Sequence, residues 1–424
     1  MNIKLTDKSN GLIKNLLLTG ICFSLPSFSV VAGSSYVPSY ISPFLYAGTT
    51  SGSSTSGFGL QGIKGGDTDG LFIVTGTSGS NGVVYNGPIN NAFTSMGSGS
   101  GTWYTINVPS SFNASSTSIY GVDNVGINNV NLVGSYVSTS YYSGTTLYPR
   151  IGFYYDGTLT TASTNSAGFK SYQAKNPTNQ RLATFTYIHS ISGGLAVGNY
   201  DFAGLGNPLG HAFIYNPTTE TQAEIQYPDD PNGNALTHTA YGIWFNSGTS
   251  YTIAGGLGNL GNIPLGLPSH GQTIEYGDPI GKAYLIDYDS SKTGSAAFSN
   301  YQTYSFKPTG SEVKKWKNKT VVTHFEGIWS NGYGTYKLPA TVAATRFASS
   351  GAEVVTITRN SNGSFNKYAK WTPLIVAGSS LSTNDSLYGN TSVGLAIYPK
   401  VINSNGDTVS DMFISDYAVT PILK

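Results

Sequence analysis

The repeating plan of the chain is clearest between residues 187 and 227, where four short segments of β-forming residues follow one another. They read Tyr187-Ile-His-Ser-Ile191, Gly194-Leu-Ala-Val-Gly-Asn-Tyr200, Gly210-His-Ala-Phe-Ile-Tyr-Asn216 and Ala223-Glu-Ile-Gln-Tyr227. Branched and aromatic residues fill the segments, while Gly, Asn and Pro stand between them, as in short strands joined by turns. This stretch predicts one antiparallel unit of three or four strands.

Similar units recur along the chain. A Gly-Ile or Gly-Val pair marks a first strand at Gly62-Ile63, Gly121-Val122, Gly242-Ile243 and Gly327-Ile328. With the copy at 187–227 included, the mean spacing is about 60 to 70 residues, longer than the ~20–30 residues of a β-solenoid repeat. A unit of this length cannot bury both of its faces alone, so neighbouring units must pack against it.

We therefore predict an all-β protein, a β-propeller of five blades, with six blades as the nearest alternative. An N-terminal strand near Tyr36 to Tyr46 and a C-terminal hairpin around Asn403-Ser-Asn-Gly406 would complete or close the ring. An open β-sandwich stays as the alternative if the repeat has no structural counterpart.

Composition excludes several classes of protein. Charged residues make up 10% of the 424 positions and the formal net charge is +1, against roughly 25% charged residues in an ordinary soluble domain. So few Glu and Lys leave little material for exposed helix faces. A near-zero net charge argues against nucleic-acid binding, which needs many cations to neutralise phosphates. The aromatic content of 13% argues against intrinsic disorder.

Residues 1–33 have the pattern of a secretory signal peptide. Lysines at positions 4, 8 and 14 precede an apolar run at 16–25, and small residues follow near Ala32. The run is too short to cross a bilayer as a helix. Its removal takes away Cys22, the only cysteine, so disulfides and thiolate ligands are excluded. We predict a secreted or cell-surface protein whose residues 34–424 form one domain, with no integral membrane segment and no cofactor.

Three segments resemble the HAF repeats of secreted bacterial proteins. These are Tyr-Gly-Ile/Val, then Leu-Val-Gly-Ser-Tyr, then Gly-His-Ala-Phe-Ile-Tyr-Asn, in which the tripeptide stands as His211-Ala212-Phe213. Other copies read Gly-Val-Val-Tyr, Ile-Gly-Phe-Tyr-Tyr and Lys-Ala-Tyr-Leu at this position, and the match covers residues 57–300. The resemblance implies an extracellular, propeller-like β protein, and it carries no catalytic residues.

A histidine and a tryptophan recur at nearly the same position of the repeat in two copies, as His238 with Trp244 and as His324 with Trp329. Glu326 lies beside the second histidine. Equivalent positions on the first strands of propeller blades surround one axis, so a ring of imidazoles could hold a metal or an anion, or the histidines could be hydrogen-bonded between blades. Flat aromatic faces suit sugar rings. No metal site is expected, since the calcium-like start at 67–70 lacks its terminal glutamate. The candidate ligand-binding residues are Trp244, Trp329, His238, His324 and Glu326, with His189 close to the same position.

Three functions stay open at this point. The leading prediction is an exported binding protein without catalytic activity, with glycan as the first ligand candidate. The second is a glycan hydrolase or lyase that uses carboxylates at the axis together with His238, His324 or Glu326. The third is a structural component of a surface layer, suggested by the Ser/Thr/Gly-rich region at 33–122.

Overall fold

The computed structural model describes residues 42–43, 58–89, 101–126, 128–142, 147–202, 210–225, 237–258, 282–306, 321–344, 350–374, 379, 381–398, 401–402, 408–410 and 413–419. Short β-strands dominate this part of the chain. Three single-turn 3-10 helices join them, at Ser110–Phe112, Ser166–Gly168 and Gly294–Ala297. Within the described residues, no helix has the length and apolarity needed to span a bilayer.

The first three sheets follow one another along the chain, and each is an antiparallel meander. Sheet 1 consists of β2 (Phe58–Gly65), β3 (Leu71–Ser78), β4 (Asn81–Pro88) and β5 (Thr102–Ile106). Sheet 2 consists of β6 (Ala114–Gly126), β7 (Asn129–Ser138), β8 (Arg150–Thr158) and β9 (Phe169–Tyr172). Sheet 3 consists of β10 (Phe185–Ser192), β11 (Leu195–Asp201), β12 (His211–Asn216) and β13 (Thr221–Glu224). One parallel residue pair, Phe185 with Arg150, links sheets 2 and 3.

Three more sheets complete the order. Sheet 4 consists of β14 (Thr237–Ser247), β15 (Ser250–Gly258), β16 (Lys282–Asp289) and β17 (Phe298–Tyr304). Sheet 5 consists of β18 (Val321–Phe325), β19 (Trp329–Ser330), β20 (Thr335–Ala344), β21 (Ser350–Thr358) and β22 (Lys370–Leu374). Sheet 6 consists of β23 (Leu381–Ser382), β24 (Ser386–Tyr388), β25 (Thr391–Tyr398), β28 (Phe413–Val419) and β1 (Ser42–Pro43). A separate hairpin pairs β26 (Val401–Ile402) with β27 (Thr408–Ser410).

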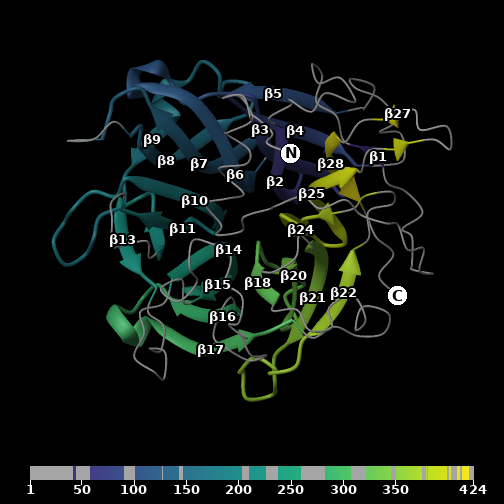
Figure 1. The fold of residues 1–424 in the computed structure, drawn as a ribbon. Coiled ribbons are helices and arrows are strands. Elements are labelled where there is room, and N and C mark those ends of the chain that lie inside the picture. Colours follow the sequence, from purple (N-terminus) through teal and green to yellow (C-terminus); the bar gives the residue numbers. More distant parts are fainter. Residues whose placement is uncertain are drawn as a thin grey trace, which may run out of the picture.

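The sheets are grouped around a common centre in chain order, as Figure 1 shows. The first strand of each sheet lies on the inside, and we call β2, β6, β10, β14, β18–β19 and β23–β24 the inner strands. Yellow strands β25 and β28, from the end of the chain, lie beside β2 near its beginning. Strand β1 pairs with β28, so sheet 6 contains segments from both ends of the chain.

Apolar side chains fill the spaces between consecutive sheets. Neighbouring residues of one strand point to opposite faces, so Ile73 packs toward sheet 2 while Val74 packs toward sheet 6. The same division separates Ile253, which packs toward sheet 3, from Ala254, which packs toward sheet 5. Burial on both faces explains why these strands are continuous apolar runs rather than alternating ones. Sheets 1 and 4 are therefore each stabilised by packing on both faces.

The inner strands share a β-bulge and a small residue. In sheets 1 to 4 the pairing with the second strand slips by one residue, which leaves Gln61, Tyr120, His189 and Tyr241 as the extra residues. A Gly or Ser follows each of them. A Cβ on Gly62 would lie 2.4 Å from the carbonyl oxygen of Tyr120 in the next sheet. The small residue is therefore required because the backbones of neighbouring inner strands meet there.

The sequence predicted much of this architecture. The all-β class is confirmed, and the four segments at 187–227 correspond to β10 through β13 with the fourth strand ending at Glu224. Inner strands also occur at Ser190-Ile191 and Ser386-Leu387, where serine replaces the marker glycine, and the second of these units went unrecognised. The predicted signal peptide at 1–33 and the turn at 403–406 lie outside the described residues.

Candidate functional site

Six equivalent residues surround one end of the inner strands. Each lies two positions after the small residue of its strand, directly after an aliphatic residue that is buried in five sheets and partly buried, as Ile328, in sheet 5. We call this end the rim, and its residues are Lys64, Asp123, Ser192, Trp244, Trp329 and Tyr388. The first three belong to sheets 1 to 3 and are charged or polar. The last three belong to sheets 4 to 6 and are aromatic.

A narrow cavity lies between the inner strands. Residues from all six sheets line it, including the bulge residues Gln61, Tyr120, His189 and Tyr241, and the rim residue Trp244. Its volume is about 30 Å³, which is room for about two water molecules. Sites for small organic ligands have volumes of about 300 Å³ or more. The cavity in this geometry therefore does not admit a sugar ring.

Aromatic rings and one imidazole fill the centre beside the cavity. The His189 ring centroid lies 4.2 Å from that of Tyr241 and 5.3 Å from that of Tyr120. Nε2 of His189 lies 2.7 Å from Oδ1 of Asn199. Burial lowers the pKa of His189 to about 4, so the ring is neutral at pH 7. Burial, together with the Glu326 carboxylate, raises the pKa of Tyr241 well above its ordinary value.

Sheet 5 contributes a buried ion pair. Nε2 of His324 lies 2.6 Å from Oε1 of Glu326, and both side chains are largely buried. Burial alone lowers the pKa of His324, but the adjacent carboxylate outweighs it and raises that pKa above the ordinary value. Glu326 is the only carboxylate among the described residues that line the cavity. Glycoside cleavage by a carboxyl pair needs two such groups about 5 to 9.5 Å apart. The described residues that line the cavity supply only one.

The three histidines of the sequence analysis occupy different places. His189 is a bulge residue, His324 lies two positions before Glu326, and His238 lies three positions before Tyr241. Burial and then the nearby His211 lower the pKa of His238 to about 3, so it belongs to a different group of side chains. The expectation that His238 and His324 are equivalent is corrected. The bulges set the register of the inner strands, and one residue of offset turns a side chain to the other face.

The two tryptophans are equivalent and touch each other. The ring centroids of Trp244 and Trp329 are 6.3 Å apart, with an interplanar angle of 65°. The Trp329 ring has the same separation from Tyr388, at 72°. All three rings are half-buried, so one side of each packs on the apolar core and another part stays accessible. They form a continuous aromatic surface over sheets 4 to 6, which we call the aromatic platform.

Two lysines lie against this platform, in different electrostatic settings. Nζ of Lys64 is 5.1 Å from the Trp244 ring centroid and 3.2 Å from Oδ1 of Asp123. Nζ of Lys337 is 5.4 Å from the Trp329 ring centroid. Such contacts attract a cation to the ring face and hold the ring in place.

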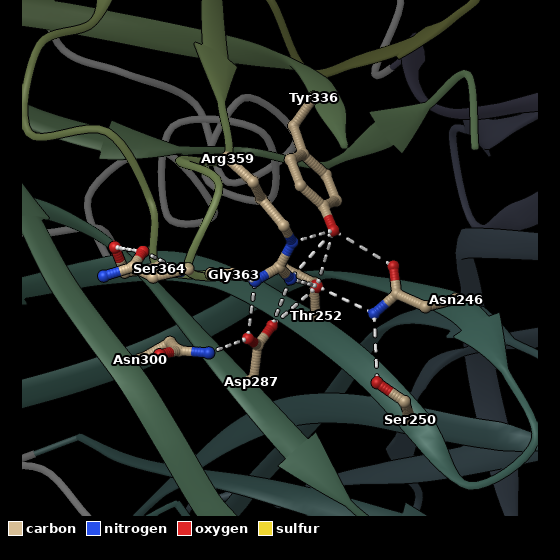
Figure 2. A network of polar contacts seen from close by, with 10 residues as sticks. Asn246, Ser250, Thr252, Asp287, Asn300, Tyr336, Arg359, Gly363 and Ser364 are labelled. Carbon is tan, nitrogen blue, oxygen red and sulfur yellow. Dashed lines mark hydrogen bonds and ion pairs between the residues drawn. The ribbon is translucent and has the colours of Figure 1, made fainter. Parts of the chain in front are cut away.

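A largely buried network of polar side chains connects sheets 4 and 5, as Figure 2 shows. Arg359 from the end of β21 binds Asp287 of β16 through two hydrogen bonds of 2.6 and 2.8 Å. Its guanidinium also donates to the hydroxyls of Tyr336 and Thr252. Thr252 is the strand partner of Trp244, and Tyr336 is the partner of Ser330, the neighbour of Trp329. The network therefore fixes sheets 4 and 5 where they present the two tryptophans.

Sequence reasoning named Trp244, Trp329, His324 and Glu326 as candidates, and it did not name Tyr388 or Lys337. Tyr388 follows Ser386-Leu387, so a search that accepted serine in place of the marker glycine would have found it. Lys337 is on a second strand and carries no motif. No group of three His, Cys, Asp or Glu side chains in the described part of the chain is arranged to hold a metal ion.

No family model and no curated protein matches the chain. Among solved structures it is similar to polysaccharide lyase Uly1, with a TM-score of 0.36, 7% identity, and coverage of 92% of this chain and 94% of that one. It is also similar to an engineered GH43 glycoside hydrolase, with a TM-score of 0.31, 10% identity, and coverage of 81% and 65%. A third is the Bombyx mori GH32 β-fructofuranosidase BmSUC1, with a TM-score of 0.24, 10% identity, and coverage of 86% and 93%. All three TM-scores are below 0.5, and they carry no argument about this chain.

Proposed function

We propose that this chain is an exported β-propeller of six blades that binds glycan on its aromatic platform. We propose six blades rather than the expected five, and the support for this is that each of the six sheets contributes residues of an inner strand to the central cavity. The packing of Leu60 and Val74 with Val393 supports contact between the first and last sheets. The 1–33 signal pattern supports export.

One observation carries the binding proposal. Trp244, Trp329 and Tyr388 occupy the same position in three consecutive sheets, and each has an accessible part. Aromatic faces bind the C–H faces of sugars, and the neighbouring lysines and Asn390 supply hydrogen-bond partners for hydroxyls. The Arg359 network connects the strands that pair with those of Trp244 and Trp329, and a fixed backbone there would lower the entropy cost of binding.

Binding rather than catalysis is the better-supported role. The polar groups that could transfer protons, His189, Tyr241 and Glu326, lie around a cavity too small for a sugar. The aromatic platform, by contrast, is at the accessible end of the same strands. A ligand held there would not reach Glu326 without movement of the rim.

The test is affinity electrophoresis through gels that contain soluble polysaccharides, preceded by a glycan array. We expect the wild-type protein to be retarded by at least one polysaccharide, without release of reducing ends. Trp329→Ala removes the central ring of the platform, and we expect it to weaken that retardation at least tenfold.

Tyr141→Ala is the matched control. Tyr141 is 57% exposed and stacks on Tyr148. It follows β7, which runs antiparallel to β6, so it lies at the opposite end of the sheets from the rim. Equal losses for Tyr141→Ala and Trp329→Ala would contradict a site on the platform. Sugar release that Glu326→Gln abolishes would favour the enzyme, and ordered self-assembly without binding would favour the surface-layer role.

A further inference from the structure

We propose that the platform selects acidic glycans, with Lys337 as the residue that binds the carboxylate or sulfate group of the sugar. This inference rests on the proposed function and names the class of glycan. It comes from the charges at the rim rather than from the rings.

Lys337 is a cation without a carboxylate partner. Its Nζ donates to the carbonyl oxygen of Gly389 at 3.3 Å and to Oδ1 of Asn390, both neutral acceptors in the turn between β24 and β25. No ion pair of Lys337 occurs within the described residues, and desolvation lowers its pKa. A half-buried ammonium of this kind has lost water without gaining a counter-ion. An acidic ligand group would supply one.

The other buried cations at this end of the sheets are already neutralised. Lys64 lies 3.2 Å from Asp123, and Arg359 binds Asp287 through both oxygens. The carboxylate beside each of them balances its charge, so neither adds a net positive charge to attract a ligand anion. Among the described residues beside the aromatic platform, the unbalanced positive charge is therefore that of Lys337.

The surroundings of Lys337 fit one acidic sugar. Its ammonium lies over the ring of Trp329, and Trp329 contacts Tyr388. A sugar stacked on these rings would bring an equatorial carboxylate or sulfate to the ammonium, while the exposed Asn390 lies next to it. A neutral sugar would use the same rings and leave the ammonium without a counter-ion. The site therefore discriminates by charge.

The experiment compares polysaccharides that differ only in charge. Polygalacturonate is paired with its methyl ester, and heparin with its desulfated form, in affinity electrophoresis at low and high salt. We expect retardation by at least one acidic polymer, at least tenfold weaker binding of the neutral partner, and weakening in 1 M NaCl. Lys337→Gln should reduce binding of the acidic polymer about tenfold, and Lys337→Arg should retain most of it.

Lys367→Gln is the matched control. Lys367 is exposed and lies over the Tyr368 ring at 5.0 Å, outside the rim. Its loss should leave binding within twofold of wild type. Binding that needs Trp329 but is equal for charged and neutral partners, or unchanged in Lys337→Gln, would overturn this inference and leave the proposed function standing. Failure of every polysaccharide on the array and in the gels to bind would overturn both. The melting temperature of Lys337→Gln, measured in parallel, separates lost binding from lost folding.

Discussion

The rim has two unlike halves built on equivalent positions. In sheets 1 to 3 the positions hold Lys64, Asp123 and Ser192, and each of them makes a polar contact with a neighbouring sheet. Asp123 accepts from the backbone N–H of Gly193 at 2.8 Å as well as pairing with Lys64. In sheets 4 to 6 the same positions hold aromatic rings in edge-on contact.

The two halves differ in how much of their side chains remains free to bind a ligand. Both halves join neighbouring sheets at one end, the first with polar bonds and the second with ring contacts. Polar bonds between Lys64, Asp123 and Gly193 satisfy those groups, so little is left to bind a ligand. The ring contacts leave part of each aromatic side chain accessible. We therefore place the proposed ligand site in the aromatic half, in sheets 4 to 6.

We expect the largest effect, a loss of unfolding free energy, from removing Arg359, which connects sheets 4 and 5 of the aromatic half. Arg359→Met leaves the largely buried Asp287 carboxylate without its cation, which should cost about 3–5 kcal/mol of unfolding free energy. Lys64→Met, the counterpart in the polar half, should cost about 1–2 kcal/mol, because Lys64 makes one 3.2 Å contact with Asp123 whereas Arg359 makes two hydrogen bonds to Asp287 and others to Tyr336 and Thr252. Urea denaturation of both variants measures the two values. Equal losses of unfolding free energy in the two variants would contradict a larger stabilising role for the Arg359 network than for the Lys64–Asp123 pair.

A pH effect tests the centre that both halves share. Burial holds the pKa of His189 at about 4, below the ordinary value near 6.5. The unfolded chain therefore binds a proton more readily, and stability falls as pH drops from about 6.5 to 4. The loss should be on the order of 3 kcal/mol. His189→Gln should remove this part of the acid sensitivity in denaturation curves measured from pH 7 to pH 4.

The comparison with wild type isolates His189 in that measurement. Asp201, whose pKa burial raises to about 6, titrates in the same window in both proteins. His324 has a raised pKa, so its contribution to the stability of the folded protein is present below pH 6.5 and is lost only at higher pH. An unchanged acid limb in His189→Gln would contradict a buried neutral imidazole.

A smaller effect should be the same in both halves. A Cβ on Gly121 would lie 2.7 Å from the carbonyl oxygen of His189, and one on Gly242 would lie 2.7 Å from the carbonyl carbon of Gly327. Each substitution by alanine should cost about 1–3 kcal/mol, because backbone must move. Thermal melts of Gly121→Ala and Gly242→Ala measure this. A cost in only one half would mean that the inner strands do not meet in the same way around the centre.

The smallest effect concerns the polar half alone. Ser192 accepts a hydrogen bond from the backbone N–H of Phe245 at 3.2 Å. Ser192→Ala should cost about 1 kcal/mol and leave glycan binding unchanged. The matched change in the other half, Tyr388→Ala, should lower binding instead. If Ser192→Ala weakens binding as much as Tyr388→Ala, the division of the rim into two halves is wrong.

The sequence by itself determined the strands, the turns and most of the repeat, because these depend on residues close together in the chain. Gly-Ile and Gly-Val pairs located four inner strands, and the equivalence of Trp244 and Trp329 followed from them. Only the tertiary structure decided which charges are neutralised and which histidines come together. Lys64 and Asp123 lie in different sheets, as do Arg359 and Asp287, and the bulge residue His189 contacts Tyr241 of the next sheet. Such pairings depend on register and on contacts between distant segments, which local residue preferences do not encode.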